Sequence, residues 1–188
     1  GIAAIGGKTA VNGSDESITT KGDAAYGIYS ASGGSMNLNN VTITTTGNGT
    51  YGIYNQEEMR VDNIDLSTSG EGSHGASTSY NAKSSLTLNG GTVHTSGENS
   101  YGLRAADQAT LNATDLTVTS DKSYGVALEN GGHATITNSK VEGADAGYYL
   151  VKGKKAYTNE LTVDGGSIAT SNADGSAFLV DSGAANIT

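Results

Sequence analysis

The ionisable residues of this sequence are scattered, and their spacing is the first guide to the chemistry they could do. A glycoside hydrolase needs two carboxylates about 5–9.5 Å apart on one face. Asp107 lies close to Arg104 in the sequence, which indicates a surface ion pair. Asp65 and Asp115 are expected at one outward position two repeats apart, so roughly 10 Å should separate them. The spacing therefore predicts no catalytic residues and no carbohydrate-cleaving site.

The possible metal ligands are equally dispersed. His74, His94 and His133 fall at different positions of the repeat described below, so they cannot converge on one ion. The sequence has no cysteine, which excludes disulfides and thiolate ligands. We expect no metal and no cofactor.

A basic loop is the first candidate binding element. The connection between Leu150 and Leu161 is longer than its counterparts in the other repeats. Loops that depart from a regular scaffold often carry binding residues. Two interpretations stay open: a solvated loop, or a contact site for an acidic partner. The residues concerned are Lys152, Lys154, Lys155 and Tyr157.

Tyrosines form the second candidate. Tyr29, Tyr54 and Tyr149 are expected to face outward, where they could contact a sugar or a protein partner. Scattered exposed aromatic residues also occur without any function. A separate set is expected to stack along the edge of the core: Tyr26, Tyr51, Tyr101 and Tyr124.

The element that must position these residues is a block of roughly 25 residues that recurs along the chain. Its mark is a Tyr-Gly-apolar step, found at 26–28, 51–53, 101–103 and 124–126, with weaker copies at 74–76, 146–148 and 176–178. A fixed period of this size indicates stacked structural units.

Each block reads as three short strands in which apolar and variable positions alternate. The inward position of the first strand is Ile28, Ile53, Ala76, Leu103, Val126, Tyr148 and Phe178. That of the second is Leu38, Val61, Leu88, Leu111, Ile136, Val163 and Ile187. That of the third is Ile43, Leu66, Val93, Leu116, Val141 and Ile168. Turn residues that tolerate the left-handed conformation are expected directly after the second strand: Asn39, Asp62, Asn89, Asn112, Thr137 and Asp164.

Three short strands per block, stacked on their equivalents, predict an all-β parallel β-helix of about seven coils over residues 1–188. A β-propeller blade needs about 40 residues, and the consensus of a leucine-rich repeat is missing. The formal net charge is −9, which argues against nucleic acid or anionic lipid as a partner. No apolar run approaches the ~20 residues of a membrane span.

The repeats resemble the passenger domains of bacterial autotransporters. The segments that carry the resemblance are Ser100–Ala105, Ala109–Asn112, Leu116–Ser120, Ser123–Val126 and Asn130–Ile136, and the similarity covers the whole chain. The resemblance implies a right-handed, pectin-lyase-like β-helix that is exported to the bacterial cell surface or the extracellular space. It also implies that the chain is an excerpt of a longer passenger, followed in the full-length protein by a C-terminal outer-membrane β-barrel.

Two functions follow from this resemblance and remain open. The first is a non-enzymatic adhesin whose exposed ladders serve bacterial self-association, biofilm formation or attachment to a host. Its partner would be a host-surface protein or glycan, or another copy of itself. The second is a secreted virulence effector that binds a host receptor, with a polysaccharide-active enzyme as a further alternative.

Overall fold

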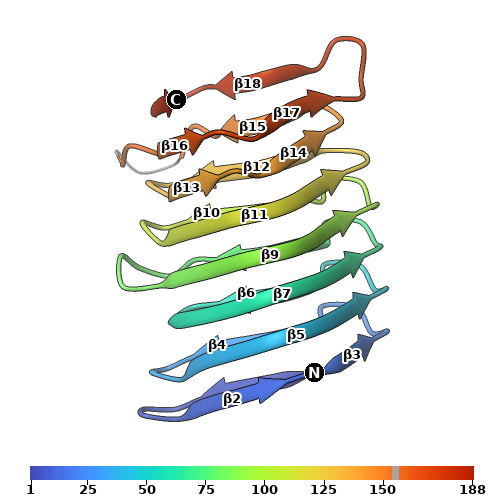
Figure 1. Ribbon diagram of the computed structural model, residues 1–188, viewed down its shortest axis with the longest axis vertical. Coiled ribbons are helices and arrows are strands. Elements are labelled where there is room, and N and C mark those ends of the chain that lie inside the picture. The colour runs from blue at the N-terminus through green and yellow to red at the C-terminus, as the bar shows by residue number, and fades with distance from the viewer. Residues whose placement is uncertain (154–156) are drawn as a thin grey trace.

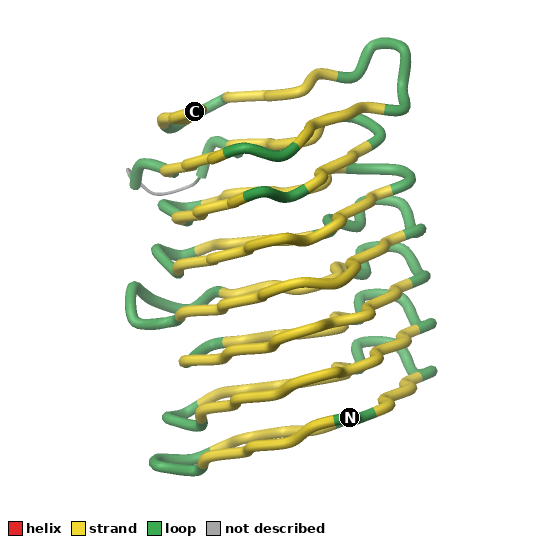
Figure 2. The backbone as a smooth tube through the Cα atoms, in the orientation of Figure 1, coloured by secondary structure: helices red, strands yellow, loops and turns green. Residues whose placement is uncertain are grey.

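The computed structural model describes residues 1–153 and 157–188, and every regular element in this part of the chain is a β-strand. The strands wind into a solenoid of about seven turns at a spacing of roughly 25 residues (Figures 1 and 2). This confirms the predicted all-β parallel β-helix. The coils rise in sequence order from the N-terminus to the C-terminus, so each coil contacts only its neighbours.

The first sheet contains one strand from each coil, and all of its pairs are parallel. In spatial order these strands are β1 (Ile2–Ile5), β4 (Tyr26–Ala31), β6 (Tyr51–Asn55), β8 (His74–Thr78), β10 (Leu103–Ala106), β12 (Tyr124–Glu129), β15 (Ala146–Leu150) and β18 (Ser176–Val180).

The second sheet combines the strands predicted as second and third. Its main path is β2 (Ala10–Ser14), β5 (Ser35–Thr45), β7 (Glu58–Thr68), β9 (Ser85–Thr95), β11 (Thr110–Ser120), β13 (His133–Thr137), β16 (Glu160–Asp164) and β19 (Ala184–Ile187). Shorter members continue it at the two ends: β3 (Ser17–Thr20), β14 (Lys140–Gly143) and β17 (Ser167–Thr170). In the middle coils the two predicted strands are one strand of 11 residues.

A left-handed residue bends each of these long strands, and in β9 two consecutive glycines, Gly90 and Gly91, have positive φ. Asn40, Asn63 and Asp115 have φ values of 53°, 55° and 55°. This residue comes two after the inward position of the second strand, so the predicted turn position was wrong by one residue in most coils. Asn and Asp tolerate this conformation better than other non-glycine residues. The side chains form a ladder, since Asn63 Nδ2 donates to Asn40 Oδ1 at 3.1 Å and Asn40 Nδ2 donates to Asp15 Oδ1 at 3.0 Å.

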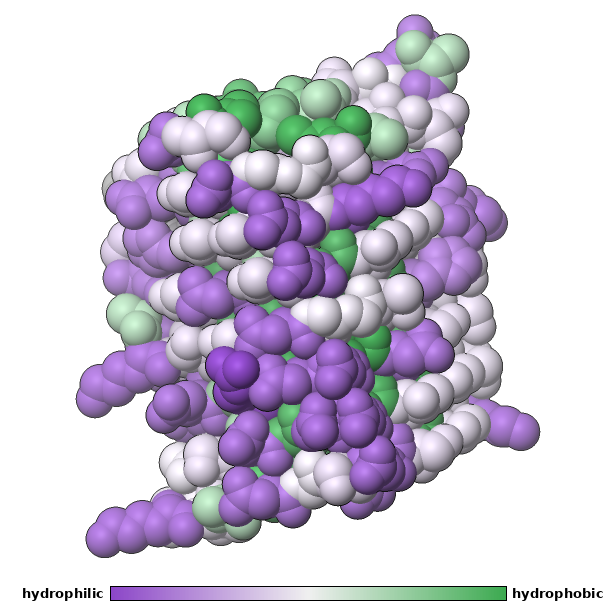
Figure 3. Space-filling model, in the orientation of Figure 1, coloured by the Kyte–Doolittle hydropathy of each residue, from purple (hydrophilic) through white to green (hydrophobic). Residues whose placement is uncertain are grey.

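The core is a stack of equivalent apolar residues. Ile28 lies beside Ile53, and Leu38 lies beside Val61, each fully or almost fully buried. Apart from the fifth coil, the predicted inward positions are confirmed by this register. The last coil leaves apolar side chains exposed, with Val180 at 47% and Ile187 at 53%. Figure 3 shows an apolar area at the C-terminal end of the solenoid.

The fifth coil corrects the predicted alignment. Ala113, and not Leu111, lies beside Leu88 and Ile136. Val118, and not Leu116, lies beside Val93 and Val141.

The same two-residue shift removes Asp115 from the outward position of Asp65. Asp115 occupies the bend, while Thr117 takes the outward position next to Thr92. The expected pair of outward carboxylates two coils apart therefore does not exist.

The glycine of the Tyr-Gly step is required by close packing. A Cβ on Gly102 would lie 2.5 Å from Val118 Cγ1 and 2.6 Å from the Gly125 carbonyl oxygen. Gly27 and Gly52 meet Ile43 and Leu66 in the same way. The glycine therefore points into the core, and the tyrosine before it points out.

Candidate binding face

A continuous strip of aromatic rings runs along the outer face of the first sheet. We call it the tyrosine strip. It extends from the second coil to the seventh, because each ring contacts a ring of the next coil. Its members are Tyr26, Tyr29, Tyr51, Tyr54, His74, Tyr101, Tyr124 and Tyr149.

The tyrosines of the Tyr-Gly step were predicted to stack at the edge of the core, and only the stacking is confirmed. They lie on the outer face together with the outward tyrosines. The ring centroids of Tyr26 and Tyr29 are 5.2 Å apart, and Tyr26 is 38% exposed. Because the glycine and the next apolar residue both face inward, the residue before the glycine is turned outward.

Neighbouring rings cover much of one another. Tyr29 and Tyr54 are nearly parallel, with an interplanar angle of 5° and centroids 5.8 Å apart. His74 and Tyr101 stack with centroids 4.5 Å apart, and Tyr124 meets Tyr149 at the same separation. These distances lie in the range of favourable aromatic pairs. The ring edges and hydroxyl groups remain available on this face.

Polar neighbours hold the hydroxyl groups in place. Gln56 Nε2 and Ser79 Oγ each donate to Tyr54 Oη at 3.2 Å, and Tyr29 Oη donates to Gln56 Oε1 at 3.3 Å. At the other end, Tyr149 Oη donates to Asp181 Oδ2 at 2.6 Å. This hydrogen bond, with burial and the charge of the carboxylate, raises the pKa of Tyr149 to about 12.

His74 takes the tyrosine position in the fourth coil. Its Nδ1 accepts a hydrogen bond from the backbone N–H of Tyr101 at 3.0 Å, so this nitrogen carries no proton. Burial, and then the charge of Arg104, lower the pKa of His74 to about 3. The imidazole is therefore a neutral ring of the strip.

One ion pair lies within the strip. Arg104 Nε donates to Glu129 Oε2 at 3.0 Å, and Arg104 Nη2 contacts the same oxygen. The predicted pairing of Arg104 with Asp107 was wrong, because the guanidinium reaches the next coil instead. Asp107 Oδ1 accepts a hydrogen bond from Asn130.

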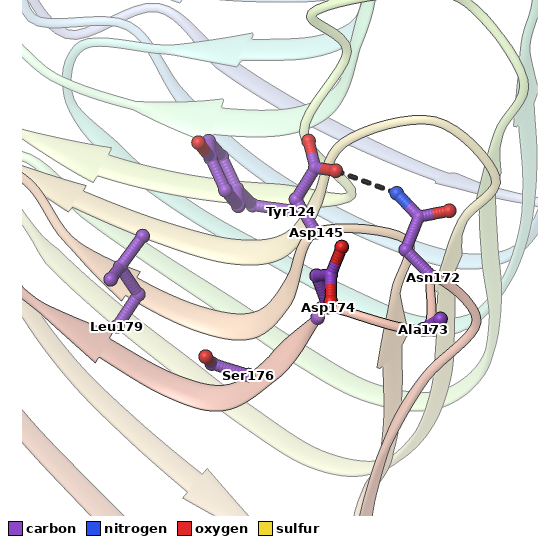
Figure 4. Close-up of a pocket in the computed structure, with 8 residues that line it drawn as sticks. Tyr124, Asp145, Asn172, Ala173, Asp174, Ser176 and Leu179 are labelled. Carbon is purple, nitrogen blue, oxygen red and sulfur yellow. Dashed lines mark hydrogen bonds between the residues drawn. The ribbon is translucent and has the colours of Figure 1, made fainter.

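The strip ends at an open hollow of about 500 Å³ (Figure 4). The ring of Tyr124 and the carboxylates of Asp145 and Asp174 face this space. Asn172 Nδ2 donates to Asp145 Oδ1 at 2.8 Å and thereby fixes that carboxylate. Leu179 adds apolar surface to the lining.

A row of carboxylates follows the corner beside the tyrosine strip. We call it the acidic row. Its members Asp23, Glu71, Glu98 and Asp121 each lie three residues before a Tyr-Gly position, and Asp145 and Asp174 continue it to the hollow. All of these side chains are exposed. The coils interlock here, since Asp23 Oδ1 accepts from the Asn48 N–H and Asn48 Oδ1 accepts from the Glu71 N–H.

The basic loop is only partly described. Lys152 is exposed and lines a cavity of about 340 Å³ next to Glu129. Tyr157 is 40% exposed and lies against Gly131. Lys154 and Lys155 lie outside the described residues. The loop thus stays a prediction, and the described part places Lys152 apart from the acidic row.

The other ionisable candidates are dispersed. His94 Nε2 lies 2.9 Å from Asp121 Oδ2, and His133 Nδ1 lies 3.2 Å from Glu160 Oε2. Within the ranges that the structure describes, no group of His, Asp and Glu could hold a metal ion.

Sequence reasoning placed Tyr29, Tyr54 and Tyr149 on the outer face but missed the rest of the strip and the whole acidic row. The sequence pattern that indicates the acidic row is an acidic residue three positions before the Tyr-Gly step in four of the coils.

No protein-family model, no curated protein and no solved structure matches this chain. The described residues contain no helix long and apolar enough to cross a membrane. The resemblance to autotransporter passengers therefore stays a prediction that rests on the repeat alone.

Proposed function

We propose that this protein is a non-enzymatic adhesion module that binds through the tyrosine strip. The observation that carries the proposal is the continuity of the strip over successive coils on one open sheet face. Tyrosine supplies large contact area at low entropic cost and offers a hydroxyl group for hydrogen bonding. It is enriched among the residues that dominate protein interfaces.

The ionisable groups of this face favour binding over catalysis. The charge of Arg104 is paired with Glu129, and His74 is a neutral ring that accepts a backbone hydrogen bond. A general acid or base should have a pKa near the working pH. Neither group meets this requirement.

The proposed setting is the bacterial cell surface or the extracellular space, as for the autotransporter passengers that the repeats resemble. A ladder repeated in every coil can make many weak contacts at once, and avidity then exceeds the affinity of each contact. This suits attachment to a surface protein, a glycan or a neighbouring cell.

A bead assay tests the proposal. Beads coated with the purified chain are mixed with one another and with host cells, and clumping and attachment are counted. The double variant Tyr29→Ser/Tyr54→Ser should lower attachment at least about tenfold, because tyrosine is enriched among the interface residues whose truncation costs more than about 1 kcal/mol each. The matched control is Tyr80→Ser, since Tyr80 is 65% exposed and lies outside the strip.

Circular dichroism and thermal unfolding must show that all variants keep the solenoid. Attachment that is unchanged in the double variant, or lowered equally by the control, would rule out the strip as the binding face. Beads that neither clump nor attach would argue against the adhesion function itself.

A further inference from the structure

The acidic row is the feature of this face that the proposed function does not yet use. Its carboxylates lie along the same edge as the Tyr-Gly positions from Asp23 to Asp174, with Asn48 in place of an acid in the third coil. Like charges repeated at this spacing repel one another. A partner with positively charged groups would relieve this repulsion, so the acidic row favours a cationic partner over a neutral or anionic one.

The chain itself neutralises little of the row. Lys122 Nζ lies 3.2 Å from Glu98 Oε1, and Asp121 contacts His94. Among the described residues, Asp23, Glu71, Asp145 and Asp174 make no ion pair. The residues that line the hollow include two carboxylates and no Lys or Arg.

The aromatic part of the face favours a polypeptide over a sugar. A sugar ring stacks on a free aromatic face, but the strip rings cover one another, as at Tyr29–Tyr54 and His74–Tyr101. What they present are ring edges and hydroxyl groups. Burial keeps the pKa of Tyr51, Tyr101 and Tyr124 above the ordinary value, so these phenols stay neutral and can accept hydrogen bonds from cationic donors.

We propose that the partner of this face is an extended basic polypeptide segment that lies along the solenoid axis. Its Lys or Arg side chains contact the acidic row, and its remaining side chains contact the tyrosine strip. One basic side chain enters the hollow between Tyr124 and the carboxylates of Asp145 and Asp174. This inference rests on the proposed function and adds the chemical class of the partner.

The dimensions agree with such a segment. At about 4.8 Å per coil, the row spans roughly 30 Å from Asp23 to Asp174. A fully extended chain covers that length with about nine residues. A twelve-residue probe is therefore long enough to follow the whole row.

A second copy of this chain is a poor occupant of the same face. Two strips that met face to face would bring two acidic rows together, and juxtaposed like charges oppose association. The inference therefore predicts that the strip does not mediate self-association at low salt.

The test uses the acetylated and amidated peptide (Arg-Gly-Tyr-Gly)3, with the same peptide carrying neutral citrulline in place of Arg as its comparison. Binding to the whole chain is measured by fluorescence anisotropy at 50 and 300 mM NaCl. The arginine peptide should bind about tenfold more tightly than the citrulline peptide at 50 mM, and the difference should shrink at 300 mM because salt screens exposed charges.

Two variants with equal charge changes locate the site. Asp145→Asn/Asp174→Asn should weaken binding of the arginine peptide about tenfold, since each exposed ion pair is worth a factor of a few. Asparagine keeps the acceptor for Asn172 at the first position. Glu58→Gln/Asp164→Asn makes the same charge change on the second sheet and should alter binding less than about twofold.

The outcomes separate this inference from the proposed function. The proposal of a basic partner would be overturned if both peptides bound equally well, or if both double variants lost the same amount of binding. It would also be overturned if the chain dimerised through the strip, or if a glycan bound this face and the arginine peptide did not. The adhesion proposal survives each of these results if Tyr29→Ser/Tyr54→Ser still lowers bead attachment. Loss of peptide binding in Asp145→Asn/Asp174→Asn with bead attachment independent of the tyrosines would instead overturn the adhesion role of the strip.

Discussion

His74 should make the solenoid less stable in mild acid, because its imidazole binds a proton there in the unfolded chain and not in the folded one. The folded chain holds this imidazole neutral, with a pKa of about 3, whereas the unfolded chain has the ordinary value of 6.5. The unfolded state therefore binds more protons between these two values, and stability rises with pH in that window. As the pH falls through 6.5, the stability that comes from the neutral imidazole is progressively lost.

The magnitude follows from the same linkage. At pH 5 the imidazole of the unfolded chain is almost fully protonated, while that of the folded chain is not. The free energy of unfolding should therefore be about 2 kcal/mol lower at pH 5 than at pH 7 from this residue alone. The physical causes of the low pKa are burial of the imidazole between Tyr51 and Tyr101 and then the charge of Arg104. In the folded chain Nδ1 also accepts a hydrogen bond from the Tyr101 N–H.

His74→Asn is the informative comparison, because an asparagine Oδ1 can accept the same hydrogen bond without titrating. The variant loses ring contacts worth about 0.5–1.5 kcal/mol each at every pH. Urea unfolding at pH 7 and pH 5 gives the loss for each protein, and contributions from carboxylates cancel in the difference. A wild-type loss no larger than that of the variant would refute the reasoning.

Three further predictions concern the scaffold. Gly102→Ala should lower the free energy of unfolding by about 1–3 kcal/mol, since its Cβ would meet Val118 and a backbone carbonyl, whereas Gly22→Ala faces open space and should be neutral or slightly stabilising in the same urea titration. Asn159→Ala should cost about 3 kcal/mol by thermal unfolding, because the buried amide accepts from two backbone N–H groups and donates to two carbonyls, while exposed Asn186→Ala should change little. Glu129→Gln should lower the free energy of unfolding by about 1–2 kcal/mol, because the half-buried guanidinium of Arg104 loses its carboxylate partner. Unfolding of this variant should also depend less on salt than unfolding of the wild type. A cost of zero for Gly102→Ala, Asn159→Ala or Glu129→Gln would contradict the corresponding contact.

The fold could be predicted from the sequence because each coil repeats the same apolar positions. Alternation fixes which side chains face inward, and the constant length of the block fixes which residues stack. Residues such as Ile28, Ile53 and Leu103 then lie in one buried column, as predicted. This information is local and repeated, so an error in one coil does not affect the others.

The register of the fifth coil could not be predicted from hydrophobicity. A shift of two residues leaves apolar side chains inward in both alignments, because Leu111 and Ala113 face the same way, as do Leu116 and Val118. Only the bend distinguishes them, since Asp115 takes the left-handed position that Asn and Gly occupy in neighbouring coils. The alignment of this coil is therefore decided by which residue tolerates the left-handed conformation at the bend, and not by which residues are apolar.

The tyrosines of the Tyr-Gly step were predicted on the wrong face for a related reason. Strict alternation places Tyr26 and Ile28 on the same face, and therefore puts the tyrosine at the core. The intervening Gly27 also faces inward, against Ile43, and this breaks the alternation by one residue. A glycine that packs closely inside a strand thus reverses the side on which the preceding residue appears.

The Tyr-Gly step therefore links the core to the proposed binding face. Close approach of the glycine to the third strand narrows the coil at that point, and the same backbone geometry turns the tyrosine outward onto the ring of the coil beside it. A core defect at Gly102 should consequently displace Tyr101 within the strip as well as destabilise the coil. Substitution of a glycine of the Tyr-Gly step is therefore expected to weaken binding even though the glycine touches no partner. Binding losses at these glycines have to be compared with losses at Tyr29 and Tyr54, whose side chains lie on the surface itself.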